Sequence, residues 1–229
     1  MSATHYISNN TLSLEELNTI IEENHTLALS EEAIANINKC REYLDNKMQT
    51  ETNPIYGINT GFGSLYSVKI STEDLTTLQE NLMKSHACGT GDEVPHSIVK
   101  IMLLLKIKSL CYGNSGVQLV TVERLIDFYN HNILPVVYTQ GSLGASGDLS
   151  PLAHLCLPLI GEGEVFVDGK RITAKQMLTE KGWETIRLKS KEGLALLNGT
   201  QFMSSYGVYI LLKTRKLSRL ADVVGAISL

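Results

Sequence analysis

The 229-residue chain carries 20 lysines and arginines against 24 aspartates and glutamates, which gives a formal net charge of −4. Apolar residues make up 43% of it and charged residues 19%, a composition typical of a folded globular protein. The mild acidity argues against a nucleic-acid surface, which needs clustered basic side chains. The apolar run at residues 98–105 is far shorter than the roughly 20 residues of a membrane span, and residues 1–10 lack a signal-peptide pattern. We therefore expect a cytoplasmic protein that binds neither nucleic acid nor a membrane.

Helical periodicity dominates the chain, with capping residues at several expected helix starts. Ser13 with Glu16 forms a capping-box pattern, and Ser30 precedes an acidic first turn. Pro95 suits the first position of a helix. We expect helices that begin at Ser13, Ser30 and Ser71, and further helices at residues 95–110, 117–130, 152–159 and 200–229.

Two glycine-dense loops, at residues 53–63 and 140–151, interrupt the helices. A β-hairpin is expected where residues 164–167 and 170–173 flank Asp168-Gly169, because Asp-Gly supplies the positive φ angles of a two-residue turn. Thr173 and Gln176 then form another capping-box pattern.

The chain ends in the apolar residues 223–229, which have no cap or polar tail. An apolar helix face needs a partner, so we expect either a covering subunit or, preferably, a longer protein. The predicted fold class is mainly α: a mixed N-terminal domain with a small β-hairpin at residues 1–198, then the truncated start of a long-helix bundle at residues 199–229.

The four cysteines Cys40, Cys88, Cys111 and Cys156 lie far apart and form no C-x-x-C pair. A zinc site needs convergent thiolates and imidazoles. We expect no metal site and four free, buried thiols.

Two functions fit the glycine-rich loops poorly. The spacing of Gly57, Gly61 and Gly63 matches no phosphate-binding motif, so no nucleotide site is expected. Ser146 as a hydrolase nucleophile would need the G-x-S-x-G elbow, and here the second glycine comes one place early. A serine hydrolase with His154 as the base stays a minor alternative.

The tripeptide Ala145-Ser146-Gly147 allows a different chemistry. Attack of the Gly147 amide nitrogen on the Ala145 carbonyl would close a five-membered ring around Ser146, and glycine suits the attacking position because it has no Cβ. Loss of water from the ring and from the Ser146 side chain would leave an exocyclic methylidene. That group is a carbon electrophile, which no standard side chain supplies.

Four segments, in order, resemble signatures of the aromatic amino-acid ammonia-lyases, and most closely those of the histidine ammonia-lyases. The resemblance covers essentially the whole chain, but only about the N-terminal half of the family's longer chains. The segments are Tyr56-Gly57-Ile58-Asn59-Thr60-Gly61-Phe62-Gly63, Ser85-His86-Ala87-Cys88-Gly89, Gly144-Ala145-Ser146-Gly147-Asp148-Leu149-Ser150-Pro151-Leu152-Ala153-His154, and Leu196-Leu197-Asn198-Gly199-Thr200-Gln201.

The resemblance implies a methylidene-imidazolone (MIO) group formed from Ala145, Ser146 and Gly147, with no metal or nucleotide. The implied reaction removes ammonia from an amino acid and gives an α,β-unsaturated acid. Tyr56 matches the base that takes the β-proton, and its phenol, with an ordinary pKa near 10, must be made more acidic to act near neutral pH. Asn198 matches a residue that hydrogen-bonds the MIO carbonyl, and it also suits a helix cap before Gly199.

Substrate choice is expected to depend on His86, which matches a position facing the substrate ring. A histidine there suits imidazole or phenol through a hydrogen bond, and Ala87 favours histidine over tyrosine as the substrate. The alternative is a histidine that faces the core and has a ring nitrogen in a hydrogen bond. Asp148 either fixes the turn before cyclisation or caps a helix starting at Leu149.

Three readings therefore stay open beside a histidine ammonia-lyase. They are a tyrosine ammonia-lyase, an aminomutase of the same family, and a non-catalytic assembly fragment. The resemblance implies a homo-oligomer, a tetramer in the family, with active-site residues from the C-terminal half and from neighbouring subunits. A fragment alone would then be inactive.

Overall fold

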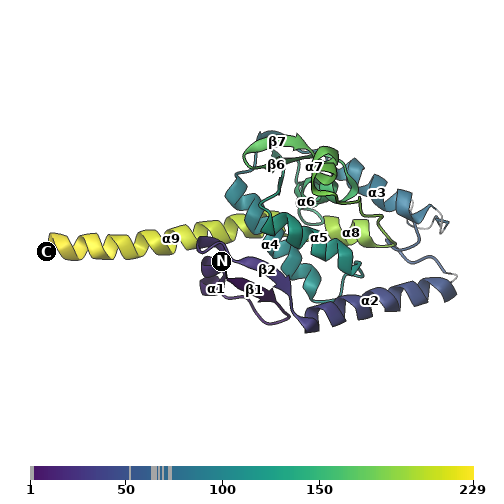
Figure 1. Ribbon diagram of the computed structural model, residues 1–229, viewed down its shortest axis with the longest axis horizontal. Helices are drawn as coiled ribbons and strands as arrows, with labels where there is room; N and C mark the ends of the chain where they lie inside the picture. The colour runs from purple at the N-terminus through teal and green to yellow at the C-terminus, as the bar shows by residue number, and fades with distance from the viewer. Residues whose placement is uncertain (1–2, 52, 63–65, 67, 69, 72–73) are drawn as a thin grey trace.

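The protein is described by a computed structural model that covers residues 3–51, 53–62, 66, 68, 70–71 and 74–229 (Figure 1). The predicted mainly α class is confirmed. In the described residues the helices are α1 (Leu14–Glu22), α2 (Glu31–Thr50), α3 (Leu75–His86), α4 (His96–Cys111), α5 (Leu119–Asn130), α6 (Leu149–Cys156), the 3-10 turn η2 (Leu157–Ile160), α7 (Ala174–Lys181), α8 (Glu192–Leu197) and α9 (Gln201–Ser228). The strands are β1 (Thr4–Ile7), β2 (Thr26–Leu29), β3 (Thr90–Glu93), β4 (Leu134–Pro135), β5 (Tyr138–Gln140), β6 (Glu164–Val167) and β7 (Lys170–Thr173).

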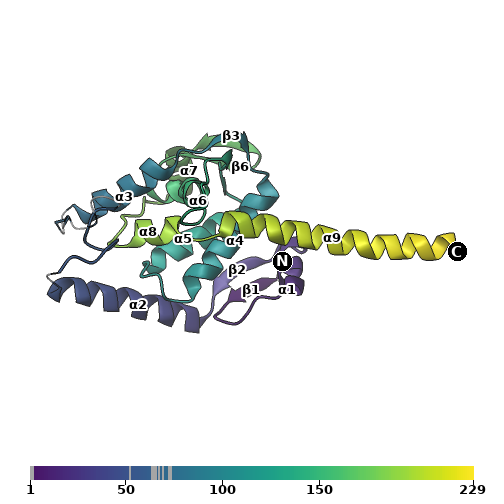
Figure 2. The same cartoon turned by 180° about the vertical axis from the view of Figure 1, so that it is seen from behind.

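Helix α4 forms the centre of the apolar core. Most of its residues between Ile98 and Cys111 are buried, whichever side of the helix they lie on, and a helix that is apolar all round must be covered on all sides. It packs against α2, α5, α6 and α9, and both views show it beside α5 and the first part of α9 (Figures 1 and 2). The core therefore connects the first third of the chain to its end.

Three small sheets surround this core. Strands β1 and β2 pair in parallel, β3 pairs with β5, and β4, β6 and β7 form an antiparallel sheet. The predicted hairpin is confirmed as β6 and β7, with φ of 50° at Asp168 and 76° at Gly169. The other strands were not predicted, because runs of two to four residues carry little periodic signal and depend on distant partners.

Several capping residues act as predicted, but α3 begins at Leu75 and not at Ser71, and Thr173 caps α7 without the reciprocal bond from the Gln176 side chain, which binds Glu180. Ser13 and Glu16 form a reciprocal capping box on α1, and the Ser30 hydroxyl accepts from the Ala33 amide at the start of α2. Pro95 precedes α4 as its N-cap residue and is not its first helical residue. Helix α6 begins at Leu149, three residues earlier than predicted, so that its N-terminus directly follows the Ala-Ser-Gly loop.

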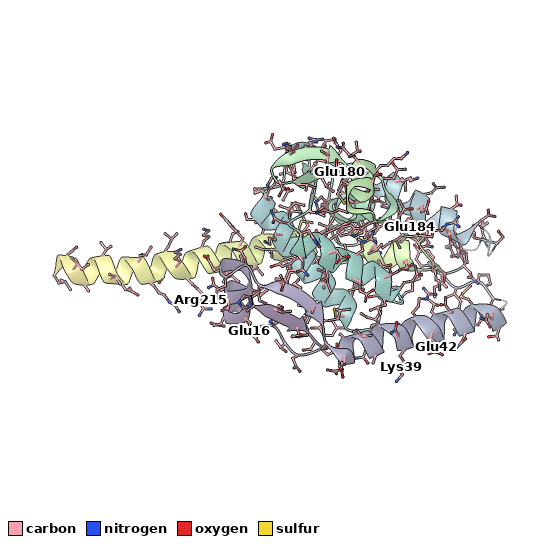
Figure 3. The ribbon with its side chains drawn as sticks, in the orientation of Figure 1. Glu16, Lys39, Glu42, Glu180, Glu184 and Arg215 are labelled. Carbon is pink, nitrogen blue, oxygen red and sulfur yellow. The ribbon has the colours of Figure 1, made fainter. Side chains whose placement is uncertain are left out.

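Helix α9 extends well beyond the rest of the molecule (Figures 1 and 2). Near its middle, Arg215 projects towards α1, and its guanidinium lies 2.6 Å from a carboxylate oxygen of Glu15 (Figure 3).

The predicted domain boundary after residue 198 falls between α8 and α9, and the division into two domains stays a prediction. None of the helices in the described ranges is long and apolar enough to span a membrane. The outer part of α9 exposes the large apolar residues Ile210, Leu211, Leu217, Leu220, Val223, Val224 and Ile227.

The cysteines are all free, but only two of them are buried. Cys111 and Cys156 lie in the core, Cys40 is partly buried and Cys88 is exposed. The prediction of four buried thiols is wrong for Cys88 and for the partly buried Cys40; α3 ends at His86, and Cys88 lies in the exposed segment that follows.

Candidate active site

The Ala-Ser-Gly tripeptide forms a tight turn between β5 and α6. Gly147 pairs with both Gly144 and Ala145, so the chain folds back on itself around Ser146. A turn of this kind brings the Gly147 amide back towards the Ala145 carbonyl, as ring closure requires. The local geometry therefore fits the cyclisation predicted from the sequence.

The turn is packed against the segment that joins α8 to α9. Gly147 has a φ of 92° and pairs with Gly199, and a Cβ on Gly147 would lie only 2.4 Å from the Gly199 carbonyl oxygen. The Asp148 amide donates to that same oxygen at 2.8 Å. A residue without a side chain is thus required at position 147, at the nitrogen that ring closure would use.

We expect Gly147→Ala to disrupt this packing and to prevent ring formation. Contact with a backbone oxygen and the positive φ should together lower the free energy of unfolding by about 2–4 kcal/mol. Gly144→Ala is the matched control, because Gly144 also has a positive φ of 79° but a Cβ there would meet nothing within 4 Å. Denaturant titration and intact mass measure both effects, and equal losses in the two variants would contradict the importance of the Gly199 contact.

The Asp148 side chain does not cap the helix that follows it. It makes no capping hydrogen bond to α6, and its carboxylate accepts from the Met203 amide at 3.0 Å instead. Met203 lies in the first turn of α9, whose free amides need acceptors. The predicted cap of the helix at Leu149 is therefore wrong. Asp148 joins the tripeptide turn to the start of α9.

Two helices begin beside the tripeptide. Helix α6 starts two residues after Gly147, and α9 starts two residues after Gly199, the partner of Gly147. Helix N-termini carry partial positive charge from their free amides. The turn is thus placed where developing negative charge would be stabilised.

A cavity of about 530 Å³ brings together the four predicted site residues Tyr56, His86, Ser146 and Asn198. This volume is within the usual range for small-molecule sites. Ala145 and Gly147 line an adjoining cavity of about 310 Å³, which shares His86 and Ser146 with the first. The remaining residues that line the larger cavity are Phe62, Leu82, Ser109, Asn114, Ser115, Leu149, Lys191, Leu194, Ala195 and Leu197.

Tyr56 lies in the first glycine loop with its side chain 57% exposed. Its ring meets Phe62 edge-on with 5.9 Å between ring centroids. The next residue, Gly57, has a φ of 74°, and a Cβ there would lie 2.5 Å from the Leu194 side chain of α8. Close packing of the loop on α8 thus places Tyr56 at the cavity. Gly63, the last residue of this predicted motif, lies outside the described residues.

His86 is the last residue of α3, and one of its ring nitrogens makes a hydrogen bond. Nδ1 lies 2.8 Å from the Leu82 carbonyl oxygen, and because a carbonyl can only accept, Nδ1 carries the proton. In the neutral ring Nε2 is then a hydrogen-bond acceptor. The alternative expected a core-facing histidine with one hydrogen-bonded nitrogen. Nδ1 is hydrogen-bonded in this way, but the ring also lines both cavities.

Asn198 is the C-cap residue of α8, whereas Thr200 is the N-cap residue of α9, so Asn198 ends one helix and does not begin the next as the helix-cap alternative expected. Its side-chain Nδ2 donates to the Leu194 carbonyl at 2.9 Å, and its backbone carbonyl accepts from the Lys106 ammonium at 2.9 Å. Asn198 also lines the cavity, so capping and a role in the site are compatible.

The serine-hydrolase alternative loses its base in this structure. His154 Nε2 accepts the Gly89 amide at 2.9 Å, and the ring stacks edge-on against Tyr138. Burial lowers the pKa of His154, which keeps the ring neutral. Its acceptor nitrogen is therefore occupied by backbone and is not directed to Ser146.

Sequence reasoning missed the polar end of the cavity. Lys191 has a φ of 71°, and its ammonium donates to the Ser115 carbonyl at 2.9 Å. Asn114 and Ser115 lie between Gly113 and Gly116, both with positive φ. That pair of glycines was the available signal for a third loop at the site.

In the described part of the chain, no group of three or more His, Cys, Asp or Glu side chains lies together as metal ligands would.

The mainly helical fold and the Ala-Ser-Gly turn beside a cavity agree with the resemblance of the sequence to the aromatic amino acid lyases. The sequence model of that family, "Aromatic amino acid lyase", matches residues 12–229. The chain belongs to this family.

Curated relatives that match include histidine ammonia-lyases. Those of Geobacillus sp. (strain WCH70) and Myxococcus xanthus are 43% and 44% identical over 223 residues, which is 97% of this chain and 44% of each relative. Our chain thus spans less than half the length of these relatives.

Solved structures of the family superpose closely. Histidine ammonia-lyase from Trypanosoma cruzi is 36% identical with a TM-score of 0.87, covering 96% of this chain and 42% of its own. Tyrosine aminomutase from Streptomyces globisporus is 33% identical with a TM-score of 0.89, covering 97% of this chain and 41% of its own.

Proposed function

We propose that this sequence belongs to an ammonia-lyase that converts L-histidine to urocanate and ammonia. The observation that carries the proposal is the meeting of Tyr56, His86, Ser146 and Asn198 on one cavity, in a chain 43% identical to histidine ammonia-lyases. In the reaction the Cβ–H and Cα–N bonds break, a Cα=Cβ double bond forms, and ammonia leaves.

The electrophile is proposed to form from Ala145, Ser146 and Gly147. Two observations support this proposal. The chain folds back on itself at Ser146, and Gly147 lies so close to the Gly199 carbonyl that a side chain would not fit there. Once formed, the MIO group supplies the electrophilic carbon that makes the substrate amine a better leaving group. Asp148 holds the turn in place through its bonds to Gly199 and Met203.

Tyr56 is proposed to remove the β-proton of the substrate. Its exposed ring lies at the cavity and is held by Phe62 and by the packing of Gly57 on α8. Lys191 lines the same cavity.

Asn198 and the two helix N-termini are proposed to stabilise negative charge at the electrophile. One Nδ2 hydrogen of Asn198 is used by Leu194, which leaves the second available. The starts of α6 and α9 add partial positive charge at the same turn. These donors are fixed before the substrate arrives, which is what electrostatic catalysis requires.

His86 is proposed to select the substrate ring. Since Nδ1 is bound to Leu82, Nε2 can accept a hydrogen bond from an imidazole N–H. A phenol O–H would serve as well, so a tyrosine ammonia-lyase is the runner-up, and an aminomutase of the same family stays possible on this scaffold. Phenylalanine offers no donor and would leave Nε2 without a partner.

We also propose a cytoplasmic homo-oligomer, a tetramer by family resemblance. The exposed apolar side chains along α9 support a covering partner. The activity of the whole protein depends on further chain as well, since the relatives are more than twice as long. A chain without those parts is expected to be inactive.

The substrate proposal predicts the effect of His86→Leu in the protein expressed from its own gene. Loss of one hydrogen bond to a polar ring should lower kcat/KM for L-histidine by about 10- to 100-fold, while kcat/KM for L-phenylalanine, whose ring has no donor, should change much less. Urocanate and cinnamate are measured by their absorbance.

His131→Leu is the matched control for that variant. His131 follows α5 and likewise directs Nδ1 to the carbonyl four residues back, at 2.9 Å, away from the cavity. It should keep wild-type kinetics. An unchanged preference for L-histidine in His86→Leu would remove His86 from substrate selection, and a wild-type protein that forms coumarate from L-tyrosine but no urocanate would favour the runner-up.

A further inference from the structure

A lysine is buried in the middle of the core, directly behind the candidate site. Lys106 is 1% exposed and lies on α4, where its neighbours in sequence are apolar. Its ammonium donates to the carbonyls of Ala195, at 2.8 Å, and Asn198, at 2.9 Å. These carbonyls belong to the C-terminal end of α8 and have no partner within that helix.

Those two hydrogen bonds fix the segment against which the tripeptide packs. Asn198 is followed by Gly199, whose carbonyl accepts the Asp148 amide and whose backbone pairs with Gly147. The Lys106 ammonium is thus connected to the Gly147 nitrogen by direct hydrogen bonds and by residues adjacent in the chain. A shift at the end of α8 would move both the Asn198 side chain and the support of the turn.

Stability alone does not account for a lysine at this position. Removing an ammonium from water is unfavourable, and an apolar residue of similar size would fill the same space without that cost. Burial lowers the pKa of Lys106 to about 8, so the group stays mostly protonated at pH 7. The nearby Cys156 is neutral there, since burial raises its thiol pKa to about 11.

We infer that Lys106 is a positioning residue that holds Asn198 and the Gly199 carbonyl in register with the Ala145-Ser146-Gly147 turn. This role rests on the proposed function, since it concerns formation of the electrophile and the placement of Asn198 beside it. It makes no contact with the substrate, so its loss should change kcat and ring formation while leaving substrate binding nearly intact.

The test compares Lys106→Met, Lys106→Arg and Lys108→Met in the protein expressed from its own gene. Lys108 is the matched control, because it is also buried on α4 and donates to backbone carbonyls, those of Ser8 and Asn10, which lie away from the cavity. Intact mass gives the fraction of molecules that have formed the ring. Kinetics with L-histidine give kcat and KM separately.

We expect Lys106→Met to lower kcat by about 10- to 100-fold, the scale of a small misplacement of catalytic groups. KM should stay within about threefold of wild type, since the side chain does not touch the substrate. The ring-bearing fraction should fall, Lys106→Arg should recover a large part of it, and Lys108→Met should match wild type. If Lys106→Met yields no soluble protein, Lys106→Gln, which keeps one donor on a shorter side chain, is measured in the same way.

Wild-type kcat and ring content in Lys106→Met or Lys106→Gln would overturn the role of Lys106. Equal losses in Lys108→Met would overturn it too, because they would reflect a damaged core. The proposed function fails separately: a wild-type protein that neither forms the ring nor releases ammonia overturns both, whereas a ring-bearing, active wild type with an unaffected Lys106 variant overturns the positioning role alone.

Discussion

Replacement of Ser146 by alanine is expected to abolish ring formation and to lower kcat by at least about 10³-fold, the scale of losing a group that takes part in covalent catalysis. Alanine has no hydroxyl to eliminate, so the exocyclic methylidene cannot form. The fold should be retained, because Ser146 is exposed at the tip of its turn. Intact mass and the rate of urocanate formation measure the two losses.

Ser142→Ala is the control for this variant. Ser142 lies in the same loop, is also exposed, and its hydroxyl makes only a long contact of 3.5 Å with Asp148. It should keep the mass and activity of the wild type. Turnover of L-histidine by Ser146→Ala at a rate near wild type would contradict the proposed electrophile.

Tyr56→Phe is expected to lower kcat by about 10²- to 10⁴-fold, the usual contribution of a general base. Phenylalanine keeps the ring and its edge-on contact with Phe62 but lacks the hydroxyl that would take the β-proton. Ring formation does not need this hydroxyl. The variant should therefore have the same mass shift as the wild type while being nearly inactive, which separates catalysis from formation of the electrophile.

Tyr43→Phe is the matched control, since Tyr43 is 65% exposed on α2 and does not line the cavity. It should be fully active. A Tyr56→Phe protein with wild-type kcat would assign the proton transfer to another residue, and a loss of the mass shift in this variant would mean that Tyr56 acts on the turn and not on the substrate.

The parts of the fold with local signals could be predicted from the sequence. The hairpin at Asp168-Gly169 follows from the φ angles that this pair allows, and the capping box of Ser13 and Glu16 needs only neighbouring residues. The motifs around Tyr56, Ser146 and Asn198 were identified instead by their resemblance to the family's signatures. The structure brings all three to one cavity.

Features that depend on distant partners could not be predicted. Strands β1 and β2 are four residues each and exist because they pair across α1. Asp148 was expected either to fix the turn or to cap its own helix, and its carboxylate binds the first turn of α9, 55 residues further on. Lys106 appears in the sequence only as a charge at the end of an apolar run, and its bonds to α8 arise from the packing of the core.

Formation of the electrophile is tested most directly by the intact mass of the wild-type protein, purified from its own gene and active with L-histidine. Two molecules of water leave during ring formation, so the measured mass should be about 36 Da below the mass encoded by the gene. An active preparation at the gene-encoded mass would contradict the cyclisation of Ala145, Ser146 and Gly147.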